Sequence, residues 1–236
     1  NVKTGTSILL SGATTTASVT TTVGDSSTVQ GFNFDTNVTT TSIVLDAGTA
    51  TVNLNSGNSD LVVSDAMATV TGITGSGLTT VNITGEDDLV LTNALPNTVT
   101  AVDASTSTGN NTIVTGTAGT AAAPLTVKGG NTVDTITAGA GFNTIQGGVG
   151  NDILVSPATA SVQDKFIFES AGSATTNGQD TITMQIGAAT GWDVLDFSAF
   201  MPGGTVFQNG GAGTAMVAIA NTATSDINIT NQVVLL

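Results

Sequence analysis

The stretch "GGNTVDTITAGAGFNTIQGGVGNDILV" (129–155) decides the fold, because it divides into three nine-residue blocks laid end to end. Each block begins with a glycine-containing turn of roughly six residues and ends in a strand of about three. Successive strands then lie on opposite sides of a flattened roll, so residues 18 apart stack on the same side. The sixth position holds Asp134, Asn143 and Asp152. We therefore predict that Asp134 and Asp152 lie one above the other.

The same blocks predict a metal site. Glycine tolerates positive φ and leaves backbone carbonyl groups without a Cβ in the way. Carbonyl and carboxylate oxygens at ~2.3 to 2.6 Å are the ligands that Ca²⁺ prefers. The ion would neutralise stacked carboxylates that otherwise repel, so we expect the roll to form only with metal bound. The candidate ligands in the blocks are Gly129, Asp134, Asn143, Gly147, Gly148, Gly150 and Asp152.

These blocks resemble the G-G-x-G-x-D-x-U-x nonapeptide repeat of RTX proteins, and "GGVGNDILV" (147–155) matches every fixed position. The other two blocks depart from the pattern at Thr132, at Ala138 and at Asn143. The resemblance implies Ca²⁺ as the bound ion.

The resemblance continues downstream in "DKFIF" (164–168), "NGQDTIT" (177–183) and "DVLDFSAF" (193–200), which are similar to the segment that follows the repeats in secreted bacterial RTX proteins. It implies that Gly178 and Asp180 also contact calcium. We interpret Asp164, Asp193 and Asp196 as turn residues that cap strand ends.

Upstream, the segments "NSGNSDLVV" (55–63), "ITGEDDLVL" (83–91) and "TSTGNNTIV" (106–114) follow the pattern more loosely. Asp60, Asp88 and Asn111 occupy the aspartate position, and Asp87 belongs to the densest acidic cluster. Adjacent carboxylates repel unless they are solvated or share a cation. Asp60, Asp87 and Asp88 are therefore further candidate ligands, with a solvated turn as the alternative. Thr-, Val- and Asp-rich strings of this kind are similar to surface-layer proteins of the RTX group.

The remaining pattern indicates an all-β fold. Short alternating strands recur between Gly, Asn, Asp and Ser, with almost no helical periodicity. We predict a parallel β-roll or β-solenoid closed by a C-terminal β cap; the alternative is a β-sandwich. We divide the chain into a Thr-rich N-terminal arm or edge strands (1–40), a solenoid (41–155) and the cap (156–236). Val233–Leu236 resemble a type I secretion signal, and an ordinary last strand would look the same.

The composition excludes several functional classes. The 236 residues include 17 acidic and three basic residues, for a net charge of -14, so cations are better partners than nucleic acid. No run approaches the ~20 apolar residues of a membrane helix, so we expect no membrane insertion. His, Cys, Tyr and Arg are absent, which excludes nucleophilic triads and disulfides. We therefore expect no enzymatic activity.

These features favour a calcium-dependent, extracellular structural protein that self-assembles as a homo-oligomer into a surface layer or filament, with cell-surface polysaccharide as a further candidate partner. Another hypothesis is the C-terminal calcium-folding and type I export module of a larger secreted hydrolase or adhesin. A further hypothesis is an ice- or surface-binding solenoid, because Thr-x-Thr pairs such as Thr135/Thr137 recur. The uneven intervals between these pairs argue against a lattice.

Overall fold

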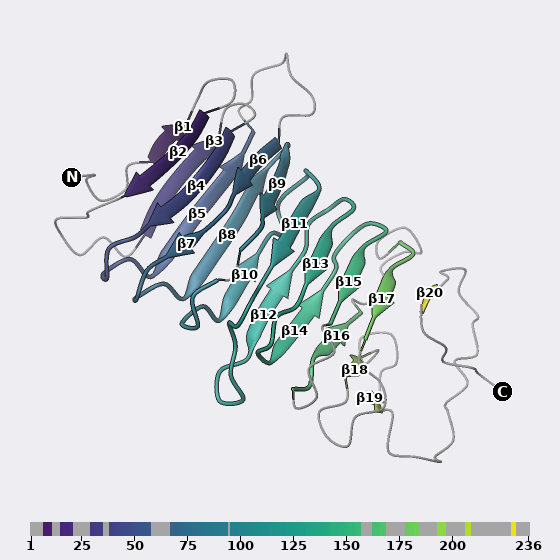
Figure 1. The fold of residues 1–236 in the computed structure, drawn as a ribbon. Coiled ribbons are helices and arrows are strands. Elements are labelled where there is room, and N and C mark those ends of the chain that lie inside the picture. Colours follow the sequence, from purple (N-terminus) through teal and green to yellow (C-terminus); the bar gives the residue numbers. More distant parts are fainter. Residues whose placement is uncertain are drawn as a thin grey trace.

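The computed structural model describes residues 7–10, 15–20, 29–34, 38–57, 67–93, 95–156, 162–168, 178–184, 193–196, 206–208 and 228–229. In these residues the chain winds into two long β-sheets that face each other (Figure 1). None of the described residues forms a helix that is long and apolar enough to span a membrane.

The strands alternate between the two sheets along most of the chain. Sheet A consists of β1 (Ser7–Leu10), β3 (Val29–Phe34), β5 (Thr51–Ser56), β8 (Thr80–Gly85), β10 (Ala101–Asp103), β12 (Leu125–Lys128), β14 (Asn143–Gln146), β16 (Lys165–Ile167), β18 (Val194–Asp196) and β19 (Val206–Gln208). Sheet B consists of β2 (Thr15–Thr20), β4 (Val38–Val44), β6 (Met67–Val70), β9 (Asp88–Leu91), β11 (Asn111–Val114), β13 (Thr135–Thr137), β15 (Ile153–Val155), β17 (Thr181–Thr183) and β20 (Asn228–Ile229), with β7 (Ile73–Thr74) paired to β4.

Each full circuit of the chain, which we call a coil, adds one strand to each sheet. Neighbouring strands are parallel throughout the described residues except for β18 and β19, which pair antiparallel at the C-terminal end. Parallel stacking of successive coils confirms the predicted all-β parallel solenoid. The alternative, a β-sandwich, would be built from antiparallel sheets.

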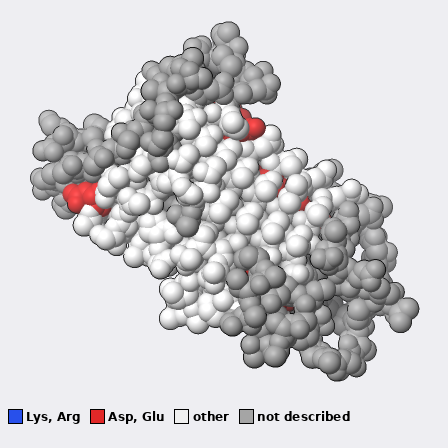
Figure 2. Space-filling model, in the orientation of Figure 1, with Lys and Arg blue, Asp and Glu red and all other residues white. Residues whose placement is uncertain are grey.

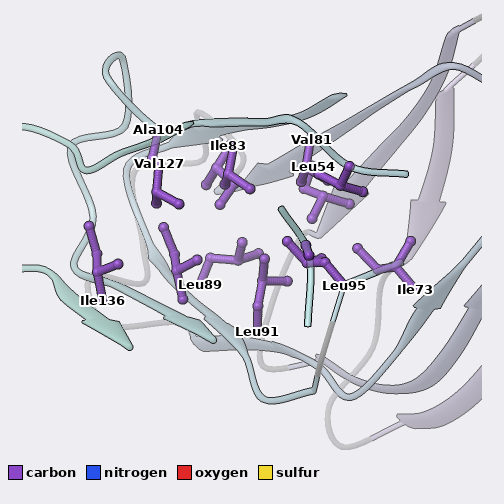
Figure 3. Close-up of a cluster of buried hydrophobic side chains, with 14 of the residues drawn as sticks. Leu54, Ile73, Val81, Ile83, Leu89, Leu91, Leu95, Ala104, Val127 and Ile136 are labelled. Carbon is purple, nitrogen blue, oxygen red and sulfur yellow. The ribbon is translucent and has the colours of Figure 1, made fainter. Parts of the chain in front are cut away.

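The core lies between the sheets and is built from one or two apolar residues per strand. In sheet A the central inward position runs through Val52, Val81, Val102, Val127, Ile145, Phe166 and Leu195. In sheet B it runs through Val70, Leu91, Ile113, Ile136, Leu154 and Ile182. Side chains from the two sheets point toward one another (Figure 3). Burying each such side chain contributes roughly 1.5 to 3 kcal/mol, which makes these rows the main source of stability.

The coils differ in length although their strands stay in register. Val127 pairs with Ile145 and Ile136 with Leu154, so this part of the chain has the 18-residue coil that the nonapeptides predict. Elsewhere Val52 pairs with Val81, and Leu154 with Ile182, which are much longer circuits. The extra residues fall between the strands, because the paired strands themselves remain aligned.

The sheets run through both boundaries of the predicted domain division. Strand β4 crosses residue 40, and β16, β17 and β18 extend the two sheets beyond residue 155. The division into arm, solenoid and cap stays a prediction. The C-terminal residues Val233–Leu236 lie outside the described part of the chain.

Candidate metal centre

Three aspartates form a ladder along one edge of the solenoid, where the turns lead from sheet A to sheet B. We call this the A-to-B edge. The backbone N–H of Asp134 donates to Oδ1 of Asp152 at 2.8 Å, and the N–H of Asp152 donates to Oδ1 of Asp180 at 3.0 Å. Each aspartate directly precedes a strand of sheet B, so the register of that sheet sets the ladder. The predicted stacking of Asp134 and Asp152 is confirmed, and Asp180 continues it.

Asn111 begins the same ladder one coil before Asp134. Its backbone N–H and its Nδ2 both donate to Asp134 Oδ1, at 2.7 and 2.9 Å. The N–H of Gly130 donates to Asp134 Oδ2 at 2.5 Å. The carboxylate of Asp134 therefore links its own turn to the preceding coil through bonds to backbone and amide groups.

The ladder carboxyls are buried, and burial dominates their electrostatics. Asp134 and Asp152 are at most 1% exposed. Burial raises the pKa of Asp134 above its usual value, although hydrogen bonds from Gly130 and Asn111 act in the opposite direction. Burial raises the pKa of Asp180 to about 6, with only the backbone N–H of Asp152 to lower it. The folded state therefore holds these groups at a free-energy cost when they are charged and no cation is near.

Glycines on the A-to-B edge bring carbonyl oxygens close to these carboxylates. A Cβ on Gly129 would collide with the carbonyl oxygen of Gly147 and lie 2.8 Å from Asp134 Oδ2. A Cβ on Gly147 would likewise collide with Asp152 Oδ2. Only glycine leaves room for a carboxylate and a carbonyl oxygen to share this space. The resulting donor set contains only oxygens, which fits a hard divalent cation such as Ca²⁺.

Two other glycines shape the same edge by their backbone conformation. Gly148 has φ of 97° and Gly150 has φ of 143°, a region that L-residues rarely adopt. The N–H of Val149 donates to the Gly130 carbonyl at 2.9 Å, which holds the third nonapeptide turn on the first. Gly178, with φ of 60°, packs against Gly150 in the same way, so it extends the column of turns beside Asp180.

Asn143 does not lie with the aspartates and glycines of the A-to-B edge. It begins β14 in sheet A, on the opposite edge of the solenoid, where the turns lead from sheet B to sheet A. We call this the B-to-A edge. Its N–H and its Nδ2 both donate to Asp164 Oδ1 at 2.9 Å, and the N–H of Asp164 donates to Asp193 Oδ1 at 2.9 Å. A second ladder, Asn143–Asp164–Asp193, thus runs along the B-to-A edge.

Sequence reasoning missed the second ladder because it interpreted Asp164, Asp193 and Asp196 as caps of strand ends. Asp164 and Asp193 do precede strands, but both are buried and connect consecutive coils. Burial raises the pKa of Asp164, while Asn143 and the hydroxyl of Ser156 donate hydrogen bonds to it. Asp196 pairs with Lys165 at 2.5 Å. The spacing Asp-x-apolar-x, shared with "DILV" (152–155), was the available signal for Asp164 and Asp193.

The upstream candidates are placed differently. Asp60 lies outside the described residues. Asn111 pairs with Leu89, so the inward position next to Asn111 belongs to Leu89 and not to Asp88. The alignment of Asp88 with the aspartate position was therefore wrong by one residue; Asp88 Oδ1 accepts the N–H of Asn110 at 2.8 Å instead. The carbonyl of Asp87 accepts a hydrogen bond from the Ser56 hydroxyl.

Carboxylates alone do not assemble a metal site in the described part of the chain. No three acidic side chains converge on one point there. An ion at the A-to-B edge would therefore take most of its ligands from the turn carbonyls, with one or two carboxylates from the ladder.

Comparison with known proteins agrees with this geometry. No curated protein and no solved structure matches the chain. One family model, that of the RTX calcium-binding nonapeptide repeat in four copies, matches residues 128–156. This match covers the turns that hold Asp134, Asn143 and Asp152, and residues 128–156 are therefore RTX-type nonapeptide repeats.

Proposed function

We propose that this protein is an extracellular, calcium-dependent structural β-solenoid that assembles with copies of itself into a surface layer or filament. The observation behind the calcium dependence is the buried ladder Asp134–Asp152–Asp180, in which the carboxylates of Asp134 and Asp152 lie against the glycine turns at Gly129 and Gly147. Gly129, Asp134, Gly147 and Asp152 are the residues that would hold Ca²⁺.

Calcium acts on the fold through charge. Two carboxylates in successive coils repel each other, and burial strengthens this repulsion. A divalent cation between the turns cancels the repulsion, so metal binding free energy becomes folding free energy. The RTX match at 128–156 supports this reading, because the described family binds calcium.

Two observations support a structural role for the chain and argue against catalysis. The sequence has no His, Cys, Tyr or Arg, and the buried acids are used in ladders between coils. A solenoid also ends in strands with an open edge, which offers a place for strand addition by another copy.

Circular dichroism of metal-free protein, titrated with CaCl₂, tests the calcium dependence. We expect calcium to strengthen the β spectrum and to raise the temperature of unfolding, and chelation to reverse both; no change in either would contradict it. Electron microscopy with calcium tests assembly separately. Sheets or fibres support the structural role, whereas a folded, dispersed monomer favours the export-module alternative.

A further inference from the structure

The outer surface of sheet B bears a regular array of β-branched residues between β11 and β17. Two parallel rows run across the strands. The first row contains Thr112, Thr135, Ile153 and Thr181, and the second contains Val114, Thr137, Val155 and Thr183. We call these eight residues the β-branched face.

The uneven spacing of Thr-x-Thr pairs in the sequence does not prevent a regular array in the folded protein. The Thr-x-Thr pairs occur at uneven intervals along the chain, yet Thr112 pairs with Thr135 and Thr135 with Ile153 without any shift of register. The turns absorb the differences in coil length. The array is therefore regular in space although it is irregular in sequence.

The face is stiff and periodic. Val, Ile and Thr have restricted χ1 angles, so their side chains hold one arrangement on a pleated surface. Rows repeat about every 4.8 Å from strand to strand, and the two rows are separated by roughly 6.7 Å along each strand. A partner that fits such a face has to match this period.

The face also lacks charge. None of the residues of β11, β13, β15 and β17 is charged. The outer side of sheet A differs, because Asp103 pairs with Lys128 across neighbouring strands and Lys165 follows further along. The described surface in Figure 2 is largely uncharged, with acidic groups confined to small patches.

We infer that the β-branched face packs against the same face of a second copy of this chain. Two copies with a net charge of -14 each repel, and this repulsion is weakest at a contact area that is free of carboxylates, as this face is. An identical face has the same period, so the two sets of rows can interdigitate as facing sheets do, about 10 Å apart. Ile153, which is 44% exposed, and the neighbouring valines supply apolar area to bury.

One face of sheet B already packs on the core, and β15 (Ile-Leu-Val) is apolar on both of its sides. The inference rests on the self-assembly proposed above and adds a lateral contact surface to the open strand edges.

A matched pair of double variants tests the assignment. Thr112→Glu/Thr135→Glu places two charges on neighbouring strands of the β-branched face, and Thr126→Glu/Thr144→Glu does the same on the outer side of sheet A. Both change the net charge equally. In calcium, we expect the first variant to need at least about tenfold more protein for half-assembly in sedimentation velocity, because like charges at a contact cost several kcal/mol. The second should assemble like the wild type.

The face assignment is overturned if both variants assemble normally or if only the sheet A variant fails. Folded wild-type monomer at all concentrations would overturn self-assembly itself, while leaving calcium-dependent folding to the dichroism test. If that monomer adsorbs to ice and Thr112→Glu/Thr135→Glu does not, the face binds an ordered solid and the inference is wrong.

If the glutamate variants do not fold, labelling of a single introduced cysteine provides a milder test. The natural chain has no cysteine, so Thr137→Cys and Thr126→Cys each create one labelling site. We expect a maleimide-linked polyethylene glycol chain on the Thr137→Cys variant to block assembly. The same label on the Thr126→Cys variant should leave assembly intact. Equal effects of the two labels would contradict the assignment.

Discussion

The backbone N–H of Asp134 donates a hydrogen bond of 2.8 Å to Oδ1 of Asp152, which lies 18 residues further along the chain. The same bond recurs between Asp152 and Asp180, although these two residues are 28 positions apart. The ladder thus follows the register of sheet B and not the length of the turns. It gives each coil a buried acceptor for the backbone of the preceding coil, and it also concentrates negative charge that a cation can neutralise.

Replacing Asp152 separates these two roles. Asp152→Asn keeps an oxygen that accepts the Asp134 N–H, and its amide can donate to Asp180 as Asn111 Nδ2 donates to Asp134. We expect metal-free stability equal to or above that of the wild type, because a buried charge is removed, together with loss of most calcium-induced stabilisation. Urea unfolding with and without calcium measures both.

Asp152→Ala should lose roughly 1 to 3 kcal/mol without calcium as well, because the Asp134 N–H loses its acceptor. Asp46→Ala is the control: Asp46 lies in a turn away from the ladder, and we expect a change within about 0.5 kcal/mol. If Asp152→Asn keeps the full calcium response, Asp152 is not a ligand.

The raised carboxyl pKa values predict that the metal-free protein becomes less stable as the pH rises, which is the opposite of what carboxyl groups with lowered pKa values produce. Burial raises the pKa of Asp180 from 3.8 to about 6, so between these values the folded state binds more protons than the unfolded state. Stability must then fall as pH rises from about 4 through 6. Asp134 and Asp164 shift in the same direction.

Thermal unfolding of metal-free protein between pH 4 and 7 checks this sign. In saturating calcium the dependence should reverse, since the ion binds the deprotonated carboxylates. A metal-free protein that is most stable at pH 7 would show that the ladder carboxyls are not held at raised pKa.

Gly150→Ala should be strongly destabilising. Gly150 has φ of 143°, and a Cβ at this position would collide with the carbonyl oxygen of Thr132 in the neighbouring coil. We expect a loss of roughly 1 to 3 kcal/mol or more, measured by urea unfolding in calcium. Gly48→Ala is the matched control, because a Cβ there meets no atom within 4 Å. Comparable losses in the two variants would show that the contact with Thr132 is unimportant.

Substitutions in the central row of the core should destabilise the protein far more than substitutions in the turns beside it. Ile136 is fully buried between the sheets, whereas Val133, three residues earlier, is 46% exposed. Ile136→Ala should cost about 2 to 5 kcal/mol through lost burial and a cavity, and Val133→Ala less than about 1 kcal/mol. Chemical denaturation in calcium measures both, and similar costs would place the core elsewhere.

Local patterns in the sequence were sufficient for the solenoid and for the stacking of Asp134 on Asp152. The nine-residue period from 129 to 155 fixes turn and strand lengths at once, so the sheet that each strand joins follows from simple counting. The aspartate position follows too, because it directly precedes the strand or begins it. Where the nine-residue period holds, the local sequence pattern is sufficient to predict how the strands pair.

Only the tertiary structure decided which acids meet outside that segment. Turns of unequal length place Asp180 on Asp152, Asp193 on Asp164 and Leu89, in place of Asp88, beside Asn111. It also decided that unevenly spaced threonines form straight rows on sheet B. The physical reason is that strand register is set by backbone hydrogen bonds and by burial of one apolar residue per strand, while turns accept extra residues at little cost.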